Sequence, residues 1–189
     1  MAHGAGGRLS RLLVEEVIRP YFSNEVLNVM HDAALLPQQE GRLAFTTDSY
    51  VVKPLFFPGG DIGRLAVCGT VNDLAVSGAK PLYLSMALVL EEGLPLSTLR
   101  RVLASMAQAA QEAGVWIVTG DTKVVERGAV DGLFINTAGV GVVSDGREVT
   151  ALRARAGQHV LISGFLGDHA LAVMAQRHGL TLPESVRSD

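Results

Sequence analysis

Three aspartates in separate segments of the 189-residue sequence are the side chains best suited to hold a divalent cation. Asp48 and Asp121 each follow an apolar run that predicts a strand, and Asp73 lies in a run of small residues that predicts a helix. Mg²⁺ prefers oxygen ligands and shares them with phosphates, whereas Zn²⁺ prefers clustered Cys and His, which this sequence lacks. The carboxylates therefore predict a Mg-nucleotide site if the fold brings them together. A helix cap or a turn is the alternative for each aspartate alone.

Polar residues beside two of these aspartates extend the candidate site. Lys123 lies two residues after Asp121, so one segment brings a cation and a carboxylate to the same phosphate group. Asn72 precedes Asp73, and two adjacent polar residues are awkward in a buried helix unless they meet a ligand or partner. A solvated lysine and a solvent-facing polar stripe are the alternatives.

Two glycine-rich segments precede predicted helices. Gly4, Gly6 and Gly7 stand before the first helix, where successive backbone N–H groups can face an anion. Residues 164–167 repeat the order of strand, glycine loop and helix. Neither segment matches the dinucleotide fingerprint or the Walker-type phosphate loop. A flexible terminus and a tight turn are the respective alternatives.

The elements that must position these residues follow from hydrophobic spacing and from Gly and Pro. The predicted helices run over residues 9–18, from an Asp61 N-cap to Gly78, from a Ser97 cap to Gly114, and over 168–178. The predicted strands and extended segments cover 43–47, 50–57, 81–90, 115–118, 133–143 and 159–163. In this assignment Asp48 begins a loop and residues 119–123 form a polar cluster after a strand. Trp116 is predicted to lie in the core, and Cys68 to be a buried, inert thiol.

The order of elements predicts an α+β fold with a mixed sheet, divided into two unequal domains. Residues 1–150 form a complete first domain, and 151–189 begin a second domain with one strand and one helix. Such a small unit cannot bury a core alone.

Composition excludes several classes of function. The chain has 16 Lys and Arg against 19 Asp and Glu, a net charge of -3, and no basic stripe, which argues against a nucleic-acid partner. Its apolar runs fall short of the roughly 20 residues that span a bilayer. A single cysteine excludes an internal disulfide framework, and no secretory signal is visible, so we expect a cytoplasmic location.

Five segments together resemble the ATP-dependent aminoimidazole ribonucleotide synthetase (PurM-like) superfamily, and within it the HypE family of hydrogenase maturation factors. They are HGAGG at 3–7, the long block at 45–81, LEEGLP at 90–95, the block at 118–141 and ISGFLGDHA at 162–170. The resemblance implies a first domain whose mixed sheet, backed by helices, joins that of a second copy to form a barrel at a homodimer interface.

The resemblance also implies ATP bound between the glycine-rich N-terminal segment and the sheet, with Mg²⁺ held by Asp48, Asp73 and Asp121. Lys123 and Asp121 would take the catalytic roles. The residues implied in cofactor binding are Gly4, Gly6, Gly7, Asp48, Asn72, Asp73, Gly120, Asp121 and Thr122.

The implied reaction is the ATP-dependent dehydration of an S-carboxamide on a C-terminal cysteine to a thiocyanate, which supplies the cyanide ligand of [NiFe]-hydrogenase iron. The implied partners are a carbamoyltransferase maturation factor and an iron-scaffold complex. The chain ends at Asp189 with Cys68 as its only cysteine, so we expect a fragment that cannot cyanate itself. A dimerisation or docking module without catalysis, and a related kinase or synthetase acting on a small molecule, are the alternatives.

Overall fold

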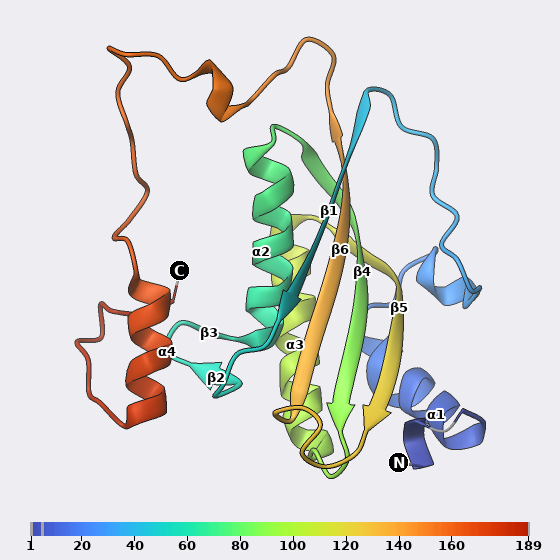
Figure 1. The fold of residues 1–189 in the computed structure, drawn as a ribbon. Coiled ribbons are helices and arrows are strands. Elements are labelled where there is room, and N and C mark those ends of the chain that lie inside the picture. The colour runs from blue at the N-terminus through green and yellow to red at the C-terminus, as the bar shows by residue number, and fades with distance from the viewer. Residues whose placement is uncertain (1, 5, 189) are drawn as a thin grey trace.

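A four-stranded mixed sheet forms the centre of the computed structural model, which describes residues 2–4 and 6–188 (Figure 1). Its strands are β1 (Arg42–Tyr50), β4 (Lys80–Glu91), β5 (Trp116–Val125) and β6 (Leu133–Val143), in the spatial order β1-β6-β4-β5. The pairs β1–β6 and β6–β4 are antiparallel, and β4–β5 is parallel. Two short strands, β2 (Phe56–Phe57) and β3 (Gly60–Asp61), pair with each other apart from this sheet. The prediction of a mixed sheet backed by helices is confirmed.

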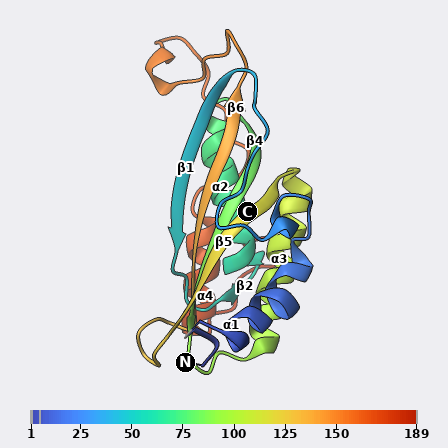
Figure 2. The same cartoon turned by 90° about the vertical axis from the view of Figure 1, so that its right-hand side faces the viewer.

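Helices α2 (Ile62–Val76) and α3 (Leu96–Ala113) cover one face of the sheet (Figure 2). The Asp61 carboxylate accepts hydrogen bonds from the N–H groups of Gly63 and Arg64, which confirms the predicted N-cap of α2. Gly114, with φ of 66°, ends α3 as expected. The start of α3 was predicted wrongly, because Pro95 and not Ser97 occupies the N-cap position. Pro95 already has the φ of -60° that its ring imposes, so the helix begins directly after it.

The core lies between this helical layer and the sheet. Along β4 and β6 every second side chain is buried against the helices, as a half-covered sheet requires. Its most buried large side chains include Ile62, Leu84, Leu88, Leu99, Leu103, Met106, Leu133 and Ile135. A polar chain also crosses this layer: the hydroxyls of Tyr50, Thr70 and Thr137 are hydrogen bonded in sequence, and Thr137 donates to the Ala66 carbonyl. This chain links β1 and β6 to α2.

Within residues 2–4 and 6–188, no helix covers the other face of the sheet (Figures 1 and 2). Leu43 and Phe45 of β1 are 69% and 71% exposed there, and Trp116 of β5 is 46% exposed. The prediction that Trp116 lies in the core is therefore wrong. Trp116 pairs with Tyr83, whose neighbour Leu84 points into the core, so alternation places Trp116 on the uncovered side.

The N-terminal segment packs along the free edge of β5 and the end of α3. It contains a 3₁₀ turn (Ala2–Gly4), α1 (Arg8–Leu12), a π-helical stretch (Leu13–Ile18) and two more 3₁₀ turns (Arg19–Tyr21 and Leu27–Val29). The predicted helix over 9–18 is thus confirmed as helical, with its second half wound more loosely. Leu13, Val17, Ile18 and Phe22 bury this segment against the core.

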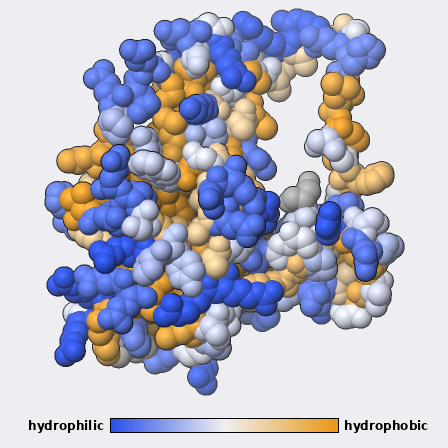
Figure 3. Space-filling view, turned by 180° about the vertical axis from the view of Figure 1, so that it is seen from behind, coloured by the Kyte–Doolittle hydropathy of each residue, from blue (hydrophilic) through white to orange (hydrophobic). Residues whose placement is uncertain are grey.

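After β6 the chain leaves the sheet, crosses a 3₁₀ turn (Ala151–Arg153) and reaches α4 (Asp168–His178), as predicted for that helix. The predicted strand over 159–163 is absent, because no neighbouring strand offers its backbone hydrogen-bond partners. Figure 3 shows apolar side chains in the open along this connection, and Val160 and Leu161 are more than 90% exposed. Among the described residues, no helix combines the length and apolar character needed to cross a membrane.

Candidate functional site

Asp48 and Asp73 lie near each other at the β1 edge of the sheet. Thr46 of β1 donates a hydrogen bond of 3.0 Å to the Asp73 carboxylate on α2, and Tyr50 reaches Thr70 on the same helix. Because side chains alternate along a strand, Asp48 points to the same side as Thr46 and Tyr50. The prediction that Asp48 begins a loop is wrong: β1 continues to Tyr50, since the residues from Thr46 onward pair with β6.

Tyr50 is the shared neighbour of these two carboxylates. Burial raises its pKa to about 12, and the charges of Asp48 and Asp73 act in the same direction, while the hydrogen bond to Thr70 opposes them. Asn72 is exposed beside Asp73 on α2. Within one chain it therefore lies on a solvent-facing polar stripe, which was the alternative to a contact with a ligand or partner. The β1 edge therefore presents a pair of carboxylates backed by a buried phenol.

Asp121 and Lys123 lie inside β5, so the prediction that they follow a strand is also wrong. They pair in register with Ala87 and Val89 on the uncovered face, while the alternate β4 residues point into the core. The Lys123 ammonium lies 3.3 Å from the Asp121 carboxylate, and both side chains are more than 60% exposed. The predicted placement of a cation beside a carboxylate is therefore present in the geometry.

The three aspartates do not meet within one chain. β1 and β5 are opposite edges of the sheet, separated by β6 and β4, and three strand spacings amount to about 14 Å. Oxygen ligands of Mg²⁺ lie about 2.1 Å from the ion, so one ion cannot bridge that span. In the part of the chain that the structure describes, no three Asp, Glu, His or Cys residues are grouped to hold a metal ion.

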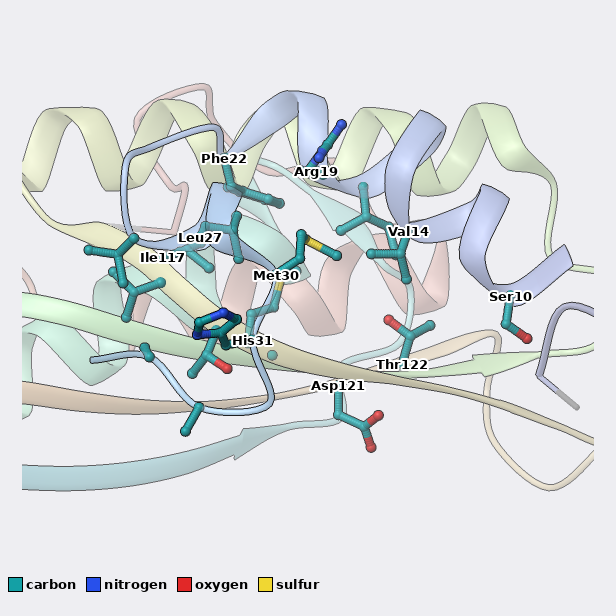
Figure 4. Close-up of a pocket in the computed structure, with 18 of the residues that line it drawn as sticks. Ser10, Val14, Arg19, Phe22, Leu27, Met30, His31, Ile117, Asp121 and Thr122 are labelled. Carbon is teal, nitrogen blue, oxygen red and sulfur yellow. The ribbon is translucent and has the colours of Figure 1, made fainter. Parts of the chain in front are cut away.

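A cavity of about 230 Å³ lies between the N-terminal segment and β5 (Figure 4). Its apolar lining includes Val14, Phe22, Leu27, Met30, Met86 and Ile117, and its polar lining includes Ser10, Arg19, His31, Thr119, Asp121 and Thr122. Figure 4 shows Thr122 pointing toward the N-terminal helix and Asp121 pointing to the opposite side of β5. The cavity and the Asp121–Lys123 pair thus share one edge strand.

Glycines hold the first residues against this strand. A Cβ on Gly4 would lie 2.6 Å from the Cβ of Val124 in β5, so only glycine allows this approach. Gly6 and Gly7 have φ values of 75° and 83° and turn the chain into α1. Gly120 faces the Met86 carbonyl with no room for a side chain. Of the predicted cofactor-binding glycines, Gly120 lines the cavity and Gly4 lies against β5, while Ala5 of the same motif is outside the described residues.

Sequence reasoning missed three residues that shape the cavity. Asn24 ties the N-terminal segment to β5, Ser10 contributes a buried hydroxyl, and Met30 has a left-handed backbone with φ of 56°. Asn24 before a short turn is a recognisable capping signal. Ser10 and Met30 carry no such signal, because their positions depend on contacts far along the chain.

Cys68 lies half-buried on α2, away from the cavity. Burial raises the pKa of its thiol, and the Arg64 charge lowers it by less. The predicted burial is thus partly met, and the raised pKa agrees with a weakly reactive thiol.

Residues 30–143 match the family described as AIR synthase related protein, N-terminal domain. The chain is 53% identical over 189 residues to the carbamoyl dehydratase HypE of Bradyrhizobium diazoefficiens, covering 100% of this chain and 55% of that protein.

Two solved structures have the same fold. The crystal structure of hydrogenase maturation protein HypE in complex with ATP is 52% identical, with a TM-score of 0.95 over 99% of this chain and 56% of that one. A HypE–HypF complex is 55% identical, with a TM-score of 0.75 over 94% of this chain and 57% of that one. The chain therefore spans about half the length of the relatives that it matches.

Proposed function

Because the chain belongs to the AIR synthase related protein family, we propose that it supplies the nucleotide-binding part of an ATP-dependent carbamoyl dehydratase in [NiFe]-hydrogenase maturation. The observation that carries this proposal is the fold match to an ATP complex of HypE over 99% of the chain. Identity of about half the residues to HypE proteins over the whole length supports the same activity.

ATP binds in this proposal between the N-terminal segment and β5. The cavity there has an apolar wall for a base, and its edge strand β5 carries Asp121 and Lys123 on the opposite side. The close approach of Gly4 to Val124 leaves the backbone of the first residues near this strand. Lys123 would neutralise the negative charge that builds up on the phosphoryl oxygens while the phosphoryl group is transferred.

Mg²⁺ would be held by Asp48, Asp73 and Asp121 across two copies of the chain, since the sheet separates these residues within one copy. The uncovered face carries exposed Leu43, Phe45 and Trp116, and the outer edges of β1 and β5 pair with no strand among the described residues. A homodimer that joins two such sheets into a barrel buries this face. It also sets β5 of one copy beside β1 of the other, so that the strand that carries Asp121 adjoins the strand that carries Asp48. Bound Mg²⁺ would neutralise charge on the ATP phosphates.

The complete protein would convert an S-carboxamide and ATP to a thiocyanate, ADP and phosphate. The amide oxygen leaves with the transferred phosphoryl group. The two protons of the amide nitrogen pass to a base as the C≡N bond forms. Cys68 is a poor carrier for the carboxamide, because it is half-buried in α2 with a raised pKa. The carrier cysteine therefore lies outside these 189 residues in this proposal.

The proposed partners are a carbamoyltransferase maturation factor, which loads the carboxamide, and an iron-scaffold complex, which receives the cyano group. The HypE–HypF complex supports a maturation partner.

Calorimetry with Mg-ATP, together with light scattering on the 189-residue chain, tests the nucleotide and dimer parts. We expect micromolar binding by a dimer. A dimer that binds no Mg-ATP would contradict a nucleotide site within this chain and favour a docking module.

Mixed dimers test whether the carboxylates come from two copies. One differently tagged chain carries Asp73→Asn and the other carries Asp121→Asn, and the heterodimer is isolated through both tags. A site shared between copies gives each heterodimer one doubly substituted and one intact site, so Mg-ATP binding returns at one site per dimer. If each site used one copy alone, both sites would be damaged and binding would not return.

A further inference from the structure

The hydroxyl of Tyr50 joins the two elements that carry the Asp48–Asp73 pair. Tyr50 lies on β1, two residues after Asp48, and only 7% of it is exposed. Its hydroxyl oxygen lies 3.3 Å from Oγ1 of Thr70, which is fully buried on α2 one turn before Asp73. The hydrogen bond between Tyr50 and Thr70 therefore spans the same two elements as the carboxylate pair (Figure 1).

The direction of this hydrogen bond follows from the buried chain of hydroxyls to which it belongs. The Thr70 hydroxyl is hydrogen bonded to that of Thr137, and Thr137 donates to the Ala66 carbonyl 3.0 Å away. A hydroxyl has one proton to donate, so Thr137 must accept from Thr70, and Thr70 must accept from Tyr50. Loss of the Tyr50 hydroxyl would leave buried Thr70 without its donor, which is unfavourable in a protein interior.

Among residues 2–4 and 6–188, one other hydrogen bond joins β1 to α2. It is an exposed bond from Thr46 to the Asp73 carboxylate, so it occupies an oxygen that a bound cation would use. The bond between Tyr50 and Thr70 is buried and uses no carboxylate. It can therefore hold the two elements together both with and without a cation.

Helix α2 leaves room for this hydroxyl because it has a glycine opposite. A Cβ on Gly69 would overlap the hydroxyl oxygen of Tyr50. Phenylalanine would fill the same ring position without a polar group that needs a partner, so packing alone does not require a hydroxyl here. Tyr50, Gly69 and Thr70 together fix where the end of β1 lies relative to α2. The charged side chains that act on Tyr50 are Asp48 and Asp73.

We propose that Tyr50 is a positioning residue for the divalent cation: its bond to Thr70 fixes the spacing of Asp48 and Asp73. This inference rests on the proposed metal site and adds the residue that sets the geometry of two of its ligands. Mg²⁺ tolerates only a narrow range of ligand positions, with oxygens about 2.1 Å from the ion. A small displacement of β1 from α2 therefore weakens metal binding. The cavity assigned to ATP lies beside β5, at the opposite edge of the sheet, and is unaffected.

The Tyr50→Phe variant of the 189-residue chain separates an effect on the metal from an effect on the nucleotide. Calorimetry measures the affinity for ATP with excess Mg²⁺ and again with EDTA, and the ratio of the two affinities reports the contribution of the metal. We expect this ratio to fall about 10-fold in Tyr50→Phe, as for other residues that support metal ligands. The affinity in EDTA stays unchanged, because the cavity beside β5 keeps its lining residues.

Two substitutions of Thr70 test the same hydrogen bond from its other side. Thr70→Val keeps the shape of the side chain and removes the hydroxyl, so we expect the ratio to fall as it does in Tyr50→Phe. Thr70→Ser keeps the hydroxyl and should keep the ratio. If Tyr50→Phe does not fold, the comparison of these two variants decides the outcome.

Val102→Ala is the control for a general loss of stability. Val102 is fully buried on α3, where it faces Gly63 at the end of α2 opposite to Asp73. The substitution leaves a small cavity in the core and lowers the melting temperature. It should leave the ratio of the two ATP affinities unchanged.

An unchanged ratio in Tyr50→Phe and Thr70→Val would overturn the positioning role. An equal loss of affinity with Mg²⁺ and with EDTA, or a lower ratio in Val102→Ala as well, would also overturn it, because the effect would then be one of stability. If the unsubstituted chain binds no ATP under either condition, the proposed function fails and this inference fails with it. If it binds ATP equally well under both, the nucleotide site stands, and the metal site fails together with this inference.

Discussion

The side-chain amide of Asn24 donates a hydrogen bond of 2.8 Å to the carbonyl oxygen of Ile117, 93 residues away in the sequence. The same amide donates to the Phe22 carbonyl, and its oxygen accepts from the N–H groups of Val26 and Leu27. One side chain therefore both orders a turn and fixes it to β5. Ile117 lines the cavity that we assign to ATP, so this contact fixes the turn beside that cavity.

Asn24→Ala removes all four hydrogen bonds and leaves the Ile117 carbonyl without this donor. We expect the free energy of unfolding to fall by about 1–3 kcal/mol, which urea denaturation measures. Mg-ATP affinity should fall too, because the cavity wall loosens. Asn28→Ala is the matched control, since among the described residues the Asn28 side chain pairs only with exposed Ser23. Equal stability of the two variants would contradict the anchoring role.

Tyr50 predicts a loss of stability at high pH. Its folded-state pKa of about 12 lies above the ordinary value of 10.0, so its contribution is complete below pH 10 and is lost as pH rises toward 12. The slope from this group is at most about 1.4 kcal/mol per pH unit. Urea denaturation between pH 9 and 11 should show a steeper fall in the unsubstituted chain than in Tyr50→Phe. Parallel curves would mean that the pKa of Tyr50 does not differ between the folded and unfolded chains.

Gly63 allows α2 and α3 to approach closely. A Cβ there would lie 2.6 Å from the Val102 carbonyl oxygen and 2.7 Å from Cγ of Met106. Gly63→Ala should therefore lower the free energy of unfolding by about 1–3 kcal/mol despite the higher helix propensity of alanine. Gly164→Ala, where a Cβ meets open space, should leave it unchanged. A thermal melt of each variant checks both expectations.

The raised pKa of Cys68 predicts slow thiol chemistry. At pH 8 little thiolate forms in the folded chain, because burial outweighs the charge of Arg64. Ellman's reagent should react several times more slowly with the folded chain than with the urea-unfolded chain. Cys68→Ala should leave Mg-ATP binding unchanged, because the thiol lines neither the cavity nor the carboxylate pair. Equal reaction rates in the two states would contradict the protected position.

Where hydrophobic spacing was regular, the sequence predicted the elements well. β6 and α4 have the predicted bounds, and α3 ends at Gly114 as expected, because buried side chains recur with one period until a stop residue. β1 and β5 were predicted too short. Polar residues such as Asp48 and Asp121 are typical of loops when the sequence alone is considered. In the structure Asp48 pairs with β6 and Asp121 pairs with β4.

The sequence alone could not predict which of the candidate site residues lie close together in the fold. Asp48 and Asp121 were predicted to follow strands and Asp73 to lie in a helix, but sheet order places β1 and β5 at opposite edges. Sheet order depends on pairings between distant residues, such as Arg42 with Val143. The cavity was likewise unpredictable, since it depends on how the N-terminal segment packs along β5. The predicted metal roles of Asp48, Asp73 and Asp121 stay predictions.

The position of β1 also sets an order of assembly during folding. β4, α3 and β5 form from consecutive residues, whereas β1 must find β6 across a long intervening chain, and it pairs on one side only. Closing such a loop has a larger entropic cost, so we expect β1 to join the sheet after β4, α3 and β5. On this expectation, the carboxylate pair of Asp48 and Asp73 forms only once β1 has paired with β6.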